Sequence, residues 1–134
     1  MNEVIQFLKE NPVQYFATVG LDGKPKVRPF QYMLEDGGRL WFCTSNKKNV
    51  YAEMQKTPYV EVSASSPSFA WVRLSGRVAF EDNRDVKNHI LAESGFVKSL
   101  YGSADNPDFE VFYLADAKAT IADFSGQPPK TYTL

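Results

Sequence analysis

The chain has one cysteine and one histidine among its 134 residues. A single cysteine excludes a disulfide within the chain, and one cysteine with one histidine cannot supply the four ligands of a zinc site. Apolar runs of about eighteen residues, which indicate a membrane-spanning helix, are missing. The first residues are charged and amphipathic, unlike a secretory signal. We therefore expect a cytoplasmic protein with no metal centre and no membrane contact.

An excess of charge of either sign is missing as well. Lysine and arginine number 15, aspartate and glutamate number 16, and the formal net charge is −1. Binding to bulk nucleic acid usually requires a basic surface, so no nucleic-acid partner is expected. Any recognition of phosphate must come from a local group of cations. No glycine-rich dinucleotide loop is present either, so a nicotinamide is expected to bind only transiently.

Aromatic residues are plentiful, at 14% of a chain that is 43% hydrophobic. A chain of this length fits one domain, residues 1–134, and buries about two-thirds of its unfolded surface. Aromatic side chains line the binding sites of flat ligands and also fill interfaces. The composition therefore predicts a single domain with a real core and suits a flat ligand.

Short alternating segments between turn residues predict a mainly β domain. We expect six or seven antiparallel strands with short helices, closed or nearly closed into a small barrel. Asp22-Gly23 predicts a hairpin between the first two strands, and the third strand should extend it as a meander. The last two strands should form a final hairpin, and Gly76 indicates a bulge. The expected strands are residues 13–19, 26–33, 39–43, 59–64, 69–80, 109–114 and 118–124.

Helices are predicted where apolar residues recur at helical spacing between capping or breaking residues. Asp82 is expected to cap the third helix, and a single helical turn is expected at 97–100. The polar, proline-rich tail is expected to be extended or loosely held. The three helices are expected at residues 2–11, 46–56 and 84–93.

Lys47 and Lys48 stand at the start of the second predicted helix, where cations are disfavoured by the helix dipole. Free backbone N–H groups, the hydroxyls of Thr44 and Ser45 and two ammonium groups together form a good phosphate site. The alternative is two solvated lysines at a cost of a few tenths of a kcal/mol. From these residues alone, both interpretations stay open.

Three motifs carry a resemblance to a known family. Residues 23–28 read Gly-Lys-Pro-Lys-Val-Arg, residues 42–44 read Phe-Cys-Thr, and a basic pair follows at 47–48. The set resembles the pyridoxamine 5′-phosphate oxidase-like family of FMN-binding split barrels, over about residues 13–80. The resemblance implies a split-barrel fold, FMN as cofactor, and a homodimer with a flavin at its interface.

The resemblance also implies a cofactor site. Arg28, Lys47 and Lys48 are expected to hold the phosphate with help from Thr44. Backbone and apolar groups of four residues are expected to face the ring and ribityl chain: Val27, Pro29, Phe30 and Cys43. Phe42 and Trp71 are expected to add aromatic surface, and Trp71 is expected to reach the flavin from the other subunit.

Two departures from the oxidases concern the substrate. Met33 occupies the position at which the oxidases have a lysine that binds the substrate phosphate. The C-terminal Trp and Arg-x-His signature of the oxidases is also absent. Pyridoxine phosphate oxidation is therefore not expected. The chain is nearer to the small nitroimidazole-resistance and general-stress flavoproteins.

Three functions follow as hypotheses. The first is an FMN oxidoreductase that passes electrons from a nicotinamide or other donor to a small flat acceptor, a quinone or nitroaromatic. The second is a non-enzymatic protein that binds or senses flavin, or holds haem or a deazaflavin. The third is a nucleic-acid-binding barrel with stacking aromatics, which the neutral charge disfavours. A small barrel fills its own interior, so a ligand lies outside it and a second copy of the chain is the natural cover.

Overall fold

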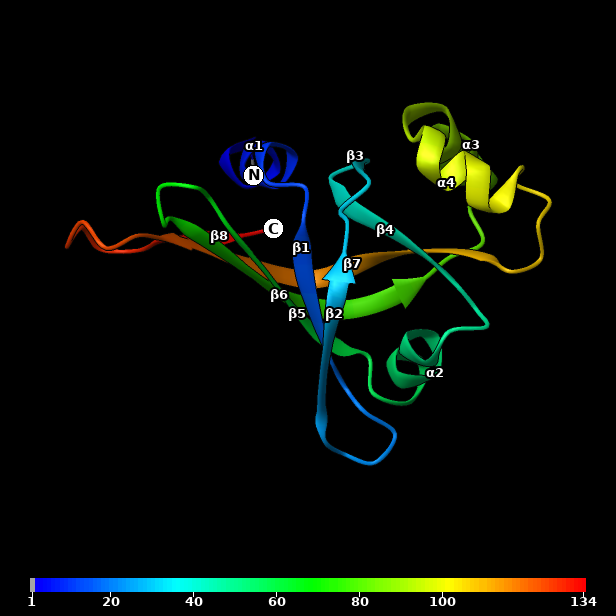
Figure 1. Ribbon diagram of the computed structural model, residues 1–134, viewed down its shortest axis with the longest axis horizontal. Coiled ribbons are helices and arrows are strands. Elements are labelled where there is room, and N and C mark those ends of the chain that lie inside the picture. Colours follow the sequence, from blue (N-terminus) through cyan, green and yellow to red (C-terminus); the bar gives the residue numbers. More distant parts are fainter. Residues whose placement is uncertain (1) are drawn as a thin grey trace.

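The computed structural model describes residues 2–134. Eight strands form one antiparallel sheet in the order β2-β1-β5-β6-β7-β4-β3, and β8 pairs with β7 outside this path (Figure 1). The strands are β1 (Gln14–Val19), β2 (Pro25–Phe30), β3 (Leu34–Asp36), β4 (Arg39–Ser45), β5 (Tyr59–Ser65), β6 (Trp71–Phe80), β7 (Phe109–Ala122) and β8 (Lys130–Thr133). The helices are α1 (Asn2–Glu10), α2 (Asn49–Lys56), α3 (Arg84–Glu93) and α4 (Gly95–Tyr101).

The sheet curls around an aromatic core. Phe16 of β1 packs against Phe30 of β2 at 4.6 Å between ring centroids, and Phe42 of β4 stacks on Phe112 of β7 at 5.5 Å. Phe30 and Phe42 also approach, at 6.3 Å, although β2 and β4 are not hydrogen-bonded neighbours. The barrel is therefore split along the line between β2 and β4, which we call the seam.

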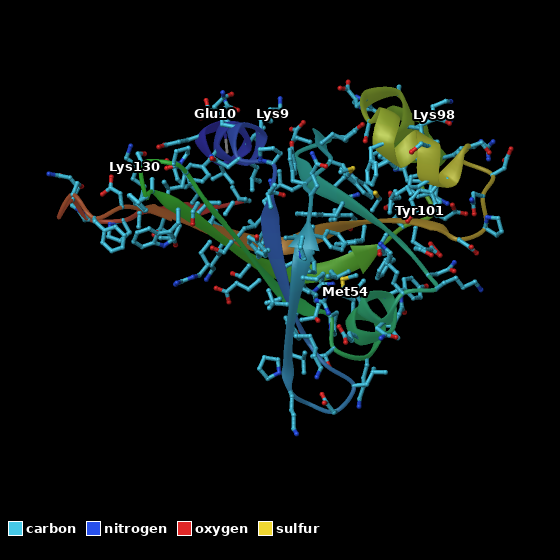
Figure 2. All side chains as sticks on the ribbon, in the orientation of Figure 1. Lys9, Glu10, Met54, Lys98, Tyr101 and Lys130 are labelled. Carbon is cyan, nitrogen blue, oxygen red and sulfur yellow. The ribbon has the colours of Figure 1, made fainter. Side chains whose placement is uncertain are left out.

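Helices α1 and α2 complete this core with their apolar faces. Figure 2 shows Met54 extending from α2 toward the sheet, and Met54 is 1% exposed. Val4 and Leu8 of α1 and Val50 of α2 belong to the same cluster.

A second core lies on the outer face of β3, β4 and β7. Trp41 and Phe109 pack there against Val86 and Ile90 of α3 and Val97 of α4. Because side chains alternate along a strand, Phe42 points into the barrel while its neighbour Trp41 points to these helices. The pair α3–α4 therefore covers this outer face and lies on the same side of β4 and β7 in Figure 1.

The predicted fold class is confirmed, and so are the first hairpin and the irregularity at Gly76. Val19 pairs with Pro25 across the hairpin. The register of β6 on β7 shifts between Ser75 and Arg77. A Cβ at Gly76 would lie 3.0 Å from the Leu114 Cβ and 3.1 Å from the Ala115 carbonyl oxygen, so the close approach of the strands requires glycine.

The predicted meander is wrong. The turn at Gly37 and Gly38 joins β3 to β4, and β4 pairs with β7 on its other side. The second strand ends at Phe30, because the residues after it no longer pair with β1. The Tyr32 backbone N–H instead donates to the Gln14 side chain at 2.6 Å. Consequently β2 is an edge strand, the sheet has eight strands instead of six or seven, and it does not close.

The C-terminal predictions also need correction. The expected final hairpin is one continuous strand, β7, because Asp116 takes a φ of 52° that kinks the strand without reversing it. The tail is not loose, since it forms β8, which pairs with β7. Asn83, not Asp82, caps α3, and its side chain accepts from the Val86 N–H. The single turn at 97–100 is a full helix, α4.

The second helix begins at Asn49, not at 46, with Lys48 at its N-cap position. Lys47 and Lys48 therefore precede the first helical turn instead of lying within it. Their backbone stays in a turn in which the Lys48 N–H donates to the Ser45 carbonyl oxygen at 3.1 Å. Across residues 2–134, no helix is long and apolar enough to cross a membrane.

Candidate functional site

A cavity of about 320 Å³ lies at the seam. Its floor comes from the end of β2 and from β4, and its far wall comes from α4. The link before β1 and the residue preceding α2 complete the rim. The lining residues are Pro12, Val13, Pro29, Phe30, Gln31, Met33, Cys43, Thr44, Lys48, Phe96, Val97, Leu100 and Tyr101.

One end of the cavity is polar and incompletely hydrogen-bonded. The Thr44 hydroxyl is buried and has no hydrogen-bond partner among the described residues. Such a group costs about 1–3 kcal/mol unless a ligand or water pairs with it. Lys48 lines the same cavity, and no side chain caps the helix that follows it. Thr44 and Lys48 thus line the same cavity beside the start of a helix, which is chemistry that suits an anion.

The rest of the cavity is largely apolar. Phe30 and Met33 line one side, and Cys43 lines the floor. Burial raises the pKa of the Cys43 thiol to about 12, although nearby Lys48 opposes the rise. Cys43 is therefore a neutral thiol at ordinary pH and packs as a small apolar group. Tyr101 lies between α4 and the sheet (Figure 2), and burial raises its pKa.

Arg28 makes contacts that the sequence did not predict. Its guanidinium bonds the Glu53 carboxylate at 2.7 Å, the Thr18 hydroxyl at 2.8 Å and the Phe16 carbonyl oxygen at 3.1 Å. Glu53 is 6% exposed and also accepts a hydrogen bond from Thr18 at 2.7 Å. Arg28 thus joins β2 to α2, and it does not line the seam cavity.

Five of the ten predicted site residues meet at the cavity: Pro29, Phe30, Cys43, Thr44 and Lys48. The others do not line it. Val27 is on the exposed outer face of β2, and Phe42 is in the barrel core. Lys47 is exposed beside the site. The predicted contacts of these residues with a cofactor stay predictions.

Trp71 lies at the far end of the sheet. It pairs with Ala122 near the end of β7, whereas Cys43 pairs with Val111 near the start. Eleven residues of strand separate these partners, roughly 35 Å. Within one chain Trp71 therefore cannot reach the seam, and its predicted contact with the other subunit's cofactor stays a prediction.

Sequence reasoning missed most of α4, since only a single helical turn was expected at 97–100. A signal was present: Ser94 is a good N-cap residue, and Phe96, Val97 and Leu100 follow at helical spacing. His89 of α3 lies 3.6 Å from Asp36 of β3 and 3.4 Å from Glu93 of α3, and it does not line the cavity. No cluster of metal-ligating side chains occurs within residues 2–134.

Comparison with known proteins identifies the family. The family model described as "Pyridoxamine 5'-phosphate oxidase" matches residues 1–120. The chain belongs to this family. A NimC/NimA family protein from Clostridium acetobutylicum is 36% identical, with a TM-score of 0.92 over 100% of this chain and 92% of the other. Residues 13–80, which carry the resemblance, thus lie within a longer match.

More distant structures share the fold of this family member. A pyridoxamine 5′-phosphate oxidase-related, FMN-binding protein from Nostoc punctiforme is 18% identical, with a TM-score of 0.72 over 97% of this chain and 86% of the other. A heme binding protein from Mycobacterium smegmatis is 20% identical, with a TM-score of 0.74 over 95% and 55%. The search of curated proteins found no match. The same fold therefore occurs in proteins described as binding different cofactors.

Proposed function

We propose that this protein binds FMN at the seam and acts as a homodimeric oxidoreductase on a small flat acceptor, a quinone or nitroaromatic. The observation that supports FMN best is the buried Thr44 hydroxyl without a partner, next to Lys48. A phosphate accepts hydrogen bonds from both groups, and an aromatic ring suits the apolar remainder of the cavity.

The residues present fit the cofactor. Thr44 and Lys48 hold the phosphate, with Lys47 adding charge beside it. Pro29, Phe30 and Cys43 present backbone and apolar surface to the ring. The only charged side chain in the lining is Lys48, so the cavity offers one anion site and no second basic cluster for an adenylate. FMN is therefore favoured over FAD.

Bound FMN supplies the electron-carrying chemistry, so the protein needs no general base of its own. The chain's residues bind and orient the cofactor and exclude water from one face. The family and the 36% identical NimC/NimA family neighbour support this class of protein. The alternative is a non-enzymatic flavin carrier or sensor. Haem held by histidine is disfavoured, because His89 lies outside the cavity.

A second copy of the chain covers the outer face of β2, β1 and β5 in this proposal. Large apolar side chains gather there: Tyr15 is 52% exposed, Val27 66% and Tyr59 64%. These strands are hydrogen-bonded neighbours, so the residues form one patch. Exposed apolar patches of this kind mark interaction surfaces. Pro29 lies on β2 and also lines the cavity, so the patch borders the site.

The absorption spectrum of the purified protein and the cofactor it releases on denaturation test the proposal. FMN is expected; mainly FAD, haem, or no flavin affinity contradicts it. Steady-state turnover with a nicotinamide donor and quinones or nitroaromatics then tests catalysis. An FMN-loaded protein that reduces none of them is a carrier or sensor.

The phosphate site is tested by comparing FMN with riboflavin, which lacks the phosphate. Lys48→Ala removes a charge-assisted contact worth roughly 1.5–3 kcal/mol, so FMN affinity falls about tenfold to a hundredfold while riboflavin affinity stays unchanged. Thr44→Val, which removes the hydroxyl alone, shows the same contrast. Replacing Lys47 and Lys48 together lowers FMN affinity at least a hundredfold. Equal losses for both ligands would mean that the lysines act through the fold.

A further inference from the structure

Helix α4 is anchored by one side. The Ser94 hydroxyl accepts from the Val97 N–H at 3.2 Å, and Gly102, with a φ of 80°, ends the helix. Val97 is 4% exposed, and Tyr101 stacks on Phe109 with 4.6 Å between centroids. These contacts fix the orientation of the helix on the sheet.

The other side of α4 carries two apolar side chains that this anchoring does not use. Phe96 is 71% exposed and Leu100 is 56% exposed, and both line the seam cavity. They are four residues apart, so they lie next to each other on the helix. Burying such side chains would stabilise the protein, and leaving them in water gives up that stabilisation. Exposed apolar side chains of this kind are typical of a surface that binds a ligand or partner.

The cavity lining thus has two kinds of chemistry. Thr44 and Lys48 are its polar members from β4 and the start of α2, and Phe96 and Leu100 are exposed apolar members from α4. Once a phosphate neutralises Lys48, no charged side chain remains in the lining to attract or orient a charged acceptor. Such a lining suits an uncharged aromatic compound with an apolar substituent.

We propose that Phe96 and Leu100 determine acceptor specificity by contacting the apolar substituent of an uncharged aromatic acceptor. This inference rests on the proposed FMN-dependent function and deepens it by naming the acceptor class. The anchored face of α4 keeps the two side chains at a fixed distance from the floor of the cavity.

Equilibrium binding of hydroquinones tests the inference apart from turnover. Hydroquinones with unbranched alkyl chains of increasing length are titrated into the FMN-loaded protein and followed by calorimetry. Each methylene that becomes fully buried raises affinity by up to about fourfold. The wild-type protein is expected to bind longer chains more tightly. Leu100→Ala and Phe96→Ala are expected to reduce the gain per methylene by at least half.

The chain offers a control for each substitution. Leu21 is 52% exposed and Phe69 is 72% exposed, close to the values for Leu100 and Phe96, and neither lines the cavity. Leu21→Ala and Phe69→Ala are expected to leave the gain per methylene unchanged. Thermal melting of every variant verifies that the fold is retained.

The possible results separate this inference from the proposed function. A wild-type protein that binds no FMN overturns both. A protein that binds FMN normally but shows no dependence on chain length, or shows the same dependence in Leu100→Ala and Phe96→Ala, overturns the inference alone. Sedimentation provides the last distinction: if the α4 variants dissociate a dimer and the controls do not, Phe96 and Leu100 contact a partner subunit and the inference is overturned.

Discussion

Arg28 is held by contacts that its position in the sequence does not reveal. Its strand motif resembles a phosphate-binding motif, but in the structure its guanidinium pairs with the carboxylate of Glu53. Their side chains are 24% and 8% exposed, so the pair is shielded from water. Removing one member of such a pair strands a buried charge.

We therefore expect Arg28→Ala to lower the free energy of unfolding by about 3 kcal/mol. Arg73 provides a matched control, since it pairs with Glu61 while both side chains are more than half exposed. Arg73→Ala should cost less than about 1 kcal/mol. Urea unfolding of the flavin-free protein measures both. Similar losses for the two variants would contradict a structural role for Arg28.

Cys43 should resist alkylation in the folded protein. Burial raises its thiol pKa from 9.0 to about 12, so at pH 8 the reactive thiolate is almost absent. Iodoacetamide labelling followed by mass spectrometry should find Cys43 unmodified at pH 8 under conditions that label the urea-denatured chain completely. Labelling at the denatured rate would show that the thiol is exposed and its pKa ordinary.

Among the secondary-structure elements, strand β8 connects the C-terminal residues to helix α1. The Tyr132 hydroxyl donates to the Glu3 carboxylate, and Lys130 pairs with the same group at 3.4 Å. The Leu134 N–H donates to the Ala117 carbonyl oxygen at 2.9 Å. The last residues therefore hold the N-terminal helix against the sheet, and both chain ends lie near one another in Figure 1.

Tyr132→Phe should lower the melting temperature at pH 7, and the difference should vanish in acid. The hydrogen bond from Tyr132 lowers the pKa of Glu3 below 4.5. A carboxylate whose pKa is lower in the folded state stabilises it above the unfolded pKa and loses this effect as the pH falls below 4.5. Melting curves from pH 7 to pH 3 measure it. A constant difference across this range would show that the carboxylate is not the partner.

Local signals explain which elements were predictable. The β1–β2 hairpin and α3 are fixed by turn and cap residues within a few positions, and both were predicted. The partner of β4 was not, because Phe42 pairs with Phe112, whose place beside it no local pattern encodes. The site shows the same division. Thr44 and Lys48 are four positions apart and were predicted together, whereas Phe96 comes to the cavity only through the packing of α4.

At the scale of the whole molecule, exposed apolar side chains gather on the outer face of β2, β1 and β5. If a second chain covers that patch, sedimentation should give a mass near twice 15.1 kDa. Val27→Glu or Tyr59→Glu places a charge in the patch and should yield monomers with weakened FMN binding. Asn88→Glu is the control, since Asn88 is exposed on α3 and lies outside this patch. A stable monomer that retains FMN at micromolar concentration would refute the dimer.

The pairing of β4 with β7 also determines at what stage of chain synthesis the cofactor site can form. Cys43 lies beside Val111, more than half the chain further along, so β4 has no partner on that side while the ribosome is still making the intervening residues. Contacts between such distant segments form late in folding. A nascent chain that ends before Phe109 already contains Thr44, Lys48 and α4, but it lacks β7, against which β4 pairs and α4 packs. We therefore expect FMN to bind only after β7 has been synthesised.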